Sequence, residues 1–301
     1  MSDDPSPRTY RMLETDAPVL IWQYDNARNW EGHWIRSLLP EAARNEHFDF
    51  RRYGLLGRNM YVVVNKLTEA QLPYFEEATR RGCNVVLLHF GDGAFREDRS
   101  AYAHCIEIWR HHWSAAMAEE PRARYLPLGY KNGFQRAGGM LAAADRPSLW
   151  GFAGDVNKTT RQVMLSAMRT FGAGREHLTD RWLSPDALPV TAYREFMDNI
   201  IFAPCPKGFV SPDSFRLFEA LEAGCIPIVE KRGPGLDDYY ATVFGPHPIP
   251  TVADWAEAPS LIRGVLDRGE TEALRQECQE WWRDYQPRVR AEISAALPPQ
   301  P

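Results

Sequence analysis

The sequence lacks the short motifs that identify several common classes of protein. Its five cysteines form no C-x-x-C pair, which argues against a zinc ribbon or a dithiol redox site, and their odd number and wide spacing are typical of a reducing compartment. No G-x-G-x-x-G or G-x-x-x-x-G-K-[ST] loop is present, so neither dinucleotide nor P-loop chemistry is indicated. A D-x-D motif is missing as well.

The chain also lacks a basic excess and a long apolar run. Its net charge of −5 provides no positive field for a nucleic-acid backbone. No apolar run approaches the roughly 20 residues of a membrane-spanning helix, and residues 1–16 form a polar, acidic tail rather than a leader peptide. We therefore expect a cytoplasmic protein without a transmembrane segment and without a nucleic-acid partner. The oligomeric state is not indicated.

The pattern along the 301 residues is that of a two-domain α/β protein. The composition, 44% hydrophobic and 25% charged, is that of a folded globular chain long enough for two cores. Strands alternating with helices predict parallel sheets. The expected strands of the first half are 19–25, 48–54, 60–66, 84–92 and 126–130, and its expected helices are 30–44, 68–81 and 100–113.

A stretch rich in small and turn-forming residues separates the two halves. We place the polar tail at 1–16, the first domain at 17–134, this linker at 135–147, the second domain at 148–268 and a last helix at 269–297.

The segment 199–229, NIIFAPCPKGFVSPDSFRLFEALEAGCIPIV, predicts a strand, a loop, a helix and a second strand. Ser211-Pro212 has the residues of a helix start, which would place Ser214 in the first turn. Unpaired amides and a partial positive charge at that turn favour a phosphate, to which Arg216 would add a charged fork. Glu219 would lie on a neighbouring face, where it can accept from sugar hydroxyls. The alternative is a plain surface ion pair between Arg216 and Glu219.

A second glycine loop opens the second domain. In LWGFAGDVNKTTRQV, Gly154 permits close approach of a ligand to the backbone, and Lys158 and Arg161 lie at the start of the following helix. A solvated helix start is the alternative interpretation.

The string CPKGFVSPDSFRLFEALEAGCIPIV closely resembles the signature of exostosin-like glycosyltransferases. The first half, with H-x-x-D at 89–92 and LPLGYKNGF at 126–134, resembles members of that family related to xylosyltransferases. The resemblance implies the GT-B architecture, in which two Rossmann-like domains with parallel sheets face a central cleft. It also implies a clamp for a nucleotide-sugar donor, most simply UDP-linked, formed by residues of the second domain. The donor residues so implied are Gly154, Lys158, Arg161, Lys207, Ser214, Arg216 and Glu219.

The resemblance implies transfer of a sugar to a saccharide or polyol acceptor. Many retaining GT-B enzymes carry an acidic residue eight positions before the residue equivalent to Glu219; here that position is Ser211, which favours inversion. The cationic residues of the clamp would make a metal cofactor unnecessary. The alternative is a saccharide-binding or scaffold protein that keeps the fold without catalysis.

The acceptor hydroxyl needs a base from the first domain, and ligands in open α/β sheets collect at the carboxyl ends of strands. Asp92 is the first candidate by this criterion, followed by Asp25 and His89; a loop-capping role is the alternative for Asp92. The histidines near residues 104–112 lack a helical H-E-x-x-H pattern, so we expect no metal site.

Overall fold

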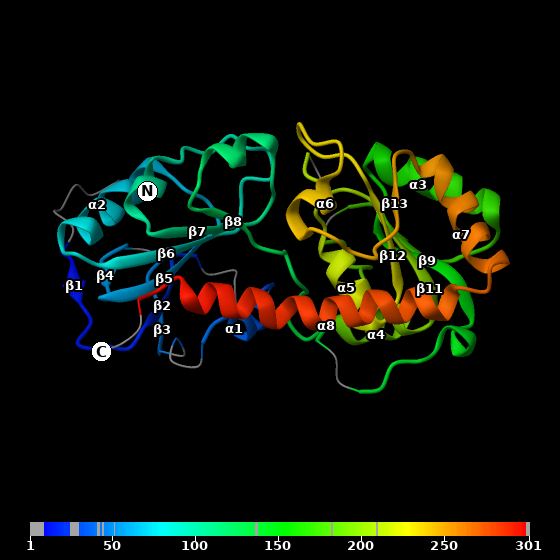
Figure 1. Cartoon of the computed structure of the whole chain (residues 1–301), viewed down its shortest axis with the longest axis horizontal. Coiled ribbons are helices and arrows are strands. Elements are labelled where there is room, and N and C mark those ends of the chain that lie inside the picture. Colours follow the sequence, from blue (N-terminus) through cyan, green and yellow to red (C-terminus); the bar gives the residue numbers. More distant parts are fainter. Residues whose placement is uncertain are drawn as a thin grey trace.

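The computed structural model describes residues 9–24, 30–40, 43, 45–50, 52–135, 138–181, 183–208 and 210–298. The chain forms two lobes, each built on a parallel β-sheet, and a long C-terminal helix lies along both of them (Figure 1). The α/β class predicted from the alternation of strands and helices is confirmed.

The first lobe contains a six-stranded sheet with the strand order β3-β2-β5-β6-β7-β8, and every neighbouring pair in it is parallel. Its strands are β2 (Val19–Trp22), β3 (Asn45–Phe48), β5 (Asn59–Val64), β6 (Asn84–His89), β7 (Glu107–Arg110) and β8 (Ala123–Tyr125). Its helices are α1 (Gly32–Leu38) and α2 (Leu72–Arg80), and a small separate sheet pairs β1 (Arg11–Met12) with β4 (Leu55–Leu56). The six strands of the main sheet lie within the predicted range 17–134, whereas β1 lies in the segment that was predicted as a polar tail.

The central strands of this sheet are continuous apolar runs because both faces are covered. In β5 and β6 all residues after the first asparagine are buried. The approach to α2 is fixed by a capping box between Thr68 and Gln71, followed by a proline at the start of the helix. These local signals are the reason that the strands at 60–66 and 84–92 and the helix at 68–81 could be predicted from the sequence.

The second lobe contains a five-stranded parallel sheet with the strand order β10-β9-β11-β12-β13. Its strands are β9 (Ser148–Asp155), β10 (Arg175–Thr179), β11 (Ile200–Cys205), β12 (Ile226–Glu230) and β13 (Thr251–Val252). Its helices are α3 (Thr159–Phe171), α4 (Val190–Asp198), α5 (Phe215–Ala223), α6 (Tyr239–Phe244) and α7 (Ala258–Asp267). The strands lie within the predicted range 148–268.

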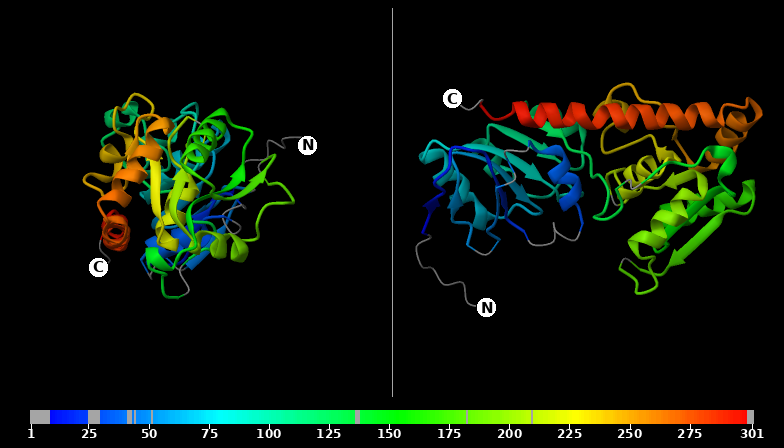
Figure 2. Two further views of the ribbon diagram at one scale, coloured as in Figure 1. Left: turned by 90° about the vertical axis from the view of Figure 1, so that its right-hand side faces the viewer. Right: turned by 90° about the horizontal axis from the view of Figure 1, so that it is seen from below.

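The last helix, α8 (Thr271–Ala295), begins beside the second lobe and ends beside the first (Figure 2). On the second lobe the Trp282 indole donates to Glu222 of α5, at 2.8 Å. On the first lobe the Tyr61 hydroxyl of β5 donates to the carbonyl of Ile293, at 3.2 Å. The helix therefore contacts both lobes. None of the helices in the described part of the chain is long and apolar enough to cross a membrane.

The prediction of a helix at 100–113 was wrong. A short 3-10 helix (Ser100–His104) is followed by strand β7, whose residues pair with β6 from Val86↔Glu107 to His89↔Arg110. The pairing with β6 on one side and β8 on the other buries Ile108 and Trp109 within the sheet, and this tertiary context overrides the local helical pattern.

Two expected strands were also displaced. The segment 48–54 is not a strand; β3 ends at Phe48, and β4 begins at Leu55. The strand predicted at 126–130 ends earlier, because β8 stops at Tyr125 and the next five residues leave the sheet. Of the described residues in the helix predicted at 30–44, Gly32–Leu38 form the α-helix α1.

Candidate functional site

A cleft of about 890 Å³ lies between the two lobes. The first lobe contributes residues that follow the carboxyl ends of its strands, among them Glu31, Asn65 and His112. The second lobe contributes the loop after β9 and the start of α5. Carboxyl ends of parallel strands are where open α/β sheets bind ligands, so this cleft is the candidate site.

Three cationic side chains predicted from the sequence meet in the cleft: Lys158, Arg161 and Arg216. Burial, together with repulsion from Arg161 and Arg216, lowers the pKa of Lys158. Burial, followed by the charge of Arg216, lowers the pKa of Arg161. Asp155 opposes both shifts and pairs with Arg161, but burial and the neighbouring cations outweigh it, so a bound anion would stabilise Lys158 and Arg161 further.

Several buried polar atoms at this place have no hydrogen-bond partner among the described residues. They are Ser214 Oγ, Arg216 Nε and Arg161 Nε, together with one oxygen of Asp155. Buried donors are normally paired, and the residues that carry these three line the cleft, so a ligand bound there would have unpaired donors beside it. The three donors suit a ligand rich in acceptor oxygens.

The start of α5 differs from the prediction. The helix begins at Phe215, and Ser214 is its N-cap residue rather than a member of the first turn. The Ser214 hydroxyl makes no capping hydrogen bond. The helix start at Ser211-Pro212 was therefore placed three residues too early. The correction brings Ser214 to the helix end itself, where amides and hydroxyl face the cleft together.

Gly154 is required by the packing of Arg216. Its φ is +147°, and a Cβ at this position would lie 2.5 Å from Arg216 Nη2. The guanidinium lies 4.3 Å from the Phe152 ring centroid and donates to the carbonyl of Ala153, at 2.6 Å. Phe152, Ala153 and Gly154 thus orient the cation, since a larger residue at 154 would displace it.

The remaining predicted donor residues separate into two groups. Glu219 lines the cleft, and burial raises the pKa of its carboxyl against the lowering effects of Arg216 and of a hydrogen bond from Tyr193. Lys207 does not line it; its ammonium lies 3.5 Å from Glu230. Lys158 Nζ donates to the carbonyl of Gly208, at 2.5 Å, and so ties the glycine loop to the turn before α5.

The two described candidates for the base, Asp92 and His89, do not line the cleft. Asp92 accepts from the amide of Arg96 at 2.5 Å and lies 3.4 Å from the buried Arg110 guanidinium, as its loop-capping alternative required. His89 is fully buried between Tyr102 and Glu97, at 2.8 and 3.0 Å, and burial lowers its pKa. Asp25, the third candidate, lies outside the described residues.

The cleft residues that sequence reasoning missed include Glu31, His112 and Asp213. Glu31 is 8% exposed, and burial raises the pKa of its carboxyl to about 7, partly offset by a hydrogen bond from Tyr24. His112 Nδ1 lies 3.4 Å from Asp213 Oδ2 across the two lobes. Glu31 had one usable signal, its position between an apolar strand, β2, and the helix that follows it, of which it is the N-cap residue. The pairing of His112 with Asp213 had none.

Asp213 is the centre of a buried network that joins the lobes. Its carboxylate accepts from Tyr125 of β8 at 2.6 Å, from Ser211 at 2.9 Å and from Tyr239 at the start of α6. Tyr239 in turn accepts from the amide of Trp113, at 2.9 Å. The residue before Ser214 is therefore fixed by groups from both sheets.

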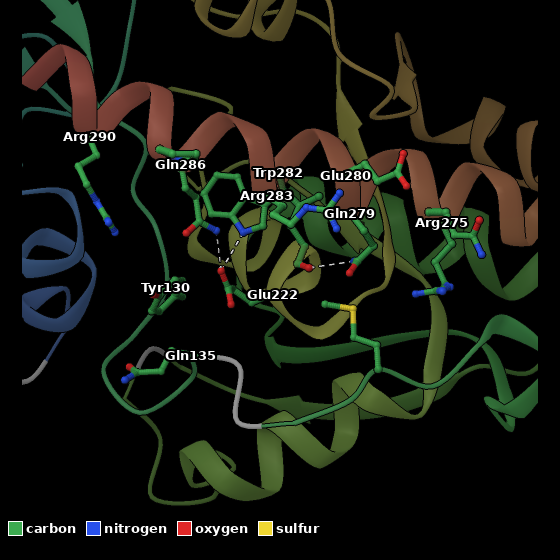
Figure 3. A pocket seen from close by; sticks show the side chains of 14 residues that line it. Tyr130, Gln135, Glu222, Arg275, Gln279, Glu280, Trp282, Arg283, Gln286 and Arg290 are labelled. Atoms are coloured by element: carbon green, nitrogen blue, oxygen red, sulfur yellow. Dashed lines mark hydrogen bonds between the residues drawn. The ribbon is translucent and has the colours of Figure 1, made fainter.

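A second cavity, of about 670 Å³, lies between α8, α5 and the segment that joins the lobes (Figure 3). Glu222 lies in it and accepts from Trp282 at 2.8 Å and from Gln286 at 3.0 Å through one oxygen. Gln279 donates to the carbonyl of Leu221, at 3.0 Å. These bonds fasten the crossing helix to the helix that begins at the cleft.

No three His, Cys, Asp or Glu side chains gather as metal ligands within the described ranges. His111 is fully buried and donates from Nδ1 to the carbonyl of Phe90, at 3.1 Å, while His112 lines the cleft.

No protein-family model and no curated protein sequence matches the chain. Solved structures do match it. Anabaena HepE in complex with UDP superposes with a TM-score of 0.57 at 8% identity, over 92% of this chain and 98% of HepE. An α1,3-fucosyltransferase gives 0.51 at 10% identity, over 98% and 94%. The DNA-modifying enzyme β-glucosyltransferase gives 0.52 at 10% identity, over 93% and 98%.

Identities this low carry information on the fold alone. Each of these structures aligns over nearly all of its own length and over both lobes of this chain, including the cleft between them. The two parallel sheets, the cleft and the crossing helix therefore constitute the GT-B fold that the sequence predicted.

Proposed function

We propose that this protein is a glycosyltransferase that moves a sugar from a nucleotide-sugar donor, most simply a UDP-sugar, to a hydroxyl of a saccharide or polyol. The observation that carries the proposal is a set of unpaired buried donors in the cleft. Ser214 Oγ and Arg216 Nε lie at the start of α5, and Arg161 Nε belongs to the first turn of α3, whose N-cap residue is Lys158. A diphosphate supplies the charge and the acceptor oxygens that these groups lack.

Uridine is supported by the contents of similar structures. HepE was solved with UDP and with UDP-glucose, and the DNA β-glucosyltransferase with uridine diphosphoglucose. Sugar transfer requires stabilisation of the departing diphosphate, and the cationic cluster is placed for this task. The motif in residues 205–229 favours an exostosin-like subtype, and Ser211 in place of a second acidic residue favours inversion.

Replacing Arg216 with alanine is expected to weaken UDP binding by about 1.5–3 kcal/mol, the usual effect of removing a charged hydrogen bond. Calorimetry with UDP, GDP and CMP and with their sugars, on wild type and variant, measures the loss of affinity. It also identifies which nucleobase the site prefers. Arg169→Ala is the matched control, because Arg169 lies on the outer surface of the same lobe in an ion pair with Glu176. Equal affinity of wild type and Arg216→Ala for every nucleotide that binds would remove the diphosphate assignment.

A protein that binds nucleotide sugars but neither hydrolyses nor transfers them would instead be a saccharide-binding or scaffold protein with the same fold. Incubation of the wild type with a UDP-sugar panel and an array of saccharide and polyol acceptors distinguishes the two functions. We expect release of UDP, with slow hydrolysis by water in the absence of an acceptor.

Turnover is expected to persist in EDTA. Lys158, Arg161 and Arg216 would offset the charge that develops on the departing diphosphate, a task that other transferases give to a divalent cation. The measurement is the rate of UDP release before and after chelation. A complete loss of rate that magnesium or manganese restores would contradict this account of the leaving group.

A further inference from the structure

The cleft contains four described carboxylates, and their surroundings differ. Three belong to the second lobe: Asp155, Asp213 and Glu219. Asp155 is paired with Arg161, and Asp213 is fully enclosed by three hydroxyl donors. Glu219 lies beside Arg216 on α5. Glu31 is the one carboxylate among the described lining residues that comes from the first lobe.

The position of Glu31 brings it opposite the start of α5. Its neighbour Trp30 lies with its ring centroid 6.3 Å from that of Phe215, the first residue of the helix. Ser214 and Arg216 flank Phe215 in the chain and line the same cleft as Glu31, so Glu31 and the proposed diphosphate site belong to opposite walls of that cleft. A group on the wall opposite the diphosphate can reach an acceptor hydroxyl that approaches the anomeric carbon from the first lobe.

We propose that Glu31 is the general base of the reaction and that Tyr24 is its positioning residue. This inference rests on the proposed function. The Glu31 carboxylate takes the proton of the acceptor hydroxyl as the acceptor oxygen bonds to the anomeric carbon. The bond from that carbon to the β-phosphate oxygen breaks, and its electron pair leaves on the nucleoside diphosphate, beside Arg216 and Ser214.

The surroundings of Glu31 suit this role. Tyr24, whose hydroxyl donates to Oε2 at 3.2 Å, is the one described side chain that donates to it, and its ring is fixed edge-on against Phe90, at 6.0 Å. The other titratable groups on this wall are Lys131, whose ammonium lies 4.8 Å from the Trp30 ring centroid, and His112, whose Nδ1 lies 3.4 Å from Asp213 Oδ2. Since burial dominates, the pKa of Glu31 is raised to about 7, so the carboxylate forms near neutral pH and remains basic enough to accept a proton.

The sign of the pH dependence follows from these contacts. The base is active when ionised, so turnover should fall as the pH drops through about 7. The Tyr24 hydrogen bond lowers the pKa of Glu31 by stabilising the carboxylate. Tyr24→Phe should therefore move the acidic limb of the pH profile to higher pH. A residue that served only the packing of the loop would leave that limb in place.

The experiment compares wild type, Glu31→Gln, Tyr24→Phe and His112→Gln with UDP-glucose, using water or a responsive acceptor. Glu31→Gln should lower kcat about 10²–10⁴-fold, the usual contribution of a general base, with UDP affinity unchanged in calorimetry. His112→Gln tests the rival base in the same cleft. In parallel, ¹³C NMR of glutamate-labelled protein should show one carboxyl titrating near pH 7 that is missing in Glu31→Gln and shifted upward in Tyr24→Phe.

Two results would overturn the assignment: a Glu31 carboxyl that titrates in the ordinary glutamate range, or near-normal turnover in Glu31→Gln with normal UDP binding. Loss of turnover in His112→Gln would then identify His112 as the base. Failure of the wild type to bind any nucleotide is a different result. It would refute the proposed function and remove the need for a base, whereas normal UDP binding with an unaffected Glu31→Gln rate refutes the base alone.

Discussion

Replacing Arg146 with alanine is expected to lower the free energy of unfolding by about 3–5 kcal/mol, a large loss for a single substitution. Arg146 lies in the segment that joins the lobes, yet it is buried. Its guanidinium donates to the carbonyls of Ile200 and Ala223, both at 2.8 Å, and to those of Met197 and Leu141, both at 3.2 Å.

The size of the effect follows from the groups that alanine would leave unpaired. Each buried carbonyl without a donor costs about 1–3 kcal/mol, and the lost side chain also leaves a cavity. The carbonyl of Ala223 lies at the end of α5, where the last helical carbonyls have no partner within the helix. One arginine thus joins the connecting segment to α4, β11 and α5.

Urea denaturation measures the loss as a lower midpoint at an unchanged slope. Arg146→Lys should lose less, since an ammonium can still reach part of the carbonyl set. Arg283→Ala is the matched control, because that side chain on α8 is largely exposed, and its removal should change stability by less than about 0.5 kcal/mol. A loss below about 1 kcal/mol in Arg146→Ala would mean that water replaces the guanidinium at these carbonyls.

Arg146 also shows where sequence reasoning ends. The stretch around it was interpreted as a linker from its small and turn-forming residues, and nothing in the local pattern indicates that the arginine is buried. By contrast, β5, β6, β11 and β12 were predicted because buried strands of a parallel sheet require continuous apolar runs. Apolar patterns that result from burial of both faces of a sheet can be predicted from the sequence. Contacts between segments distant in the chain cannot.

The same distinction holds within the cleft. Gly154, Lys158, Arg161, Ser214, Arg216 and Glu219 were predicted, and all of them line it. They occur next to strand ends and helix starts, so their positions follow from local structure. The residues that one lobe places opposite the other in the cleft could not be predicted in this way. Asp92 also follows a strand, but its carboxylate is bound to the Arg96 amide and faces Arg110, which pairing of β6 with β7 brings beside it.

The early prediction of the α5 start has a similar cause. Ser211-Pro212 is a favourable local helix start, but Ser211 and Asp213 are held by Tyr239 and Tyr125. These tertiary bonds keep Ser211, Pro212 and Asp213 out of the helix, and the backbone of Ser214, the N-cap residue, is in the β region. The hydrogen-bond network around Asp213 therefore determines the residue at which α5 begins.

Replacing Asp213 with alanine is accordingly expected to lower both the stability and the affinity for UDP. Burial, followed by the charge of Asp213, raises the pKa of Tyr125 well above its ordinary value, so the hydroxyl stays protonated and donates to the carboxylate. Tyr239 behaves in the same way. Alanine would leave these buried hydroxyls without their acceptor, at a cost of about 3–5 kcal/mol of unfolding free energy.

The affinity for UDP should fall as well, because Asp213 directly precedes Ser214, and its loss frees the segment that presents the helix end to the cleft. Tyr125→Phe separates the two effects: it removes one hydroxyl from the first lobe but leaves Ser211 and Tyr239 bound to Asp213, so about 1–2 kcal/mol of stability should be lost with UDP affinity nearly unchanged. Urea denaturation and calorimetry on the same preparations provide both quantities. If Asp213→Ala binds UDP as tightly as wild type, Ser214 is positioned without the network, and the donor site does not depend on the junction between the lobes.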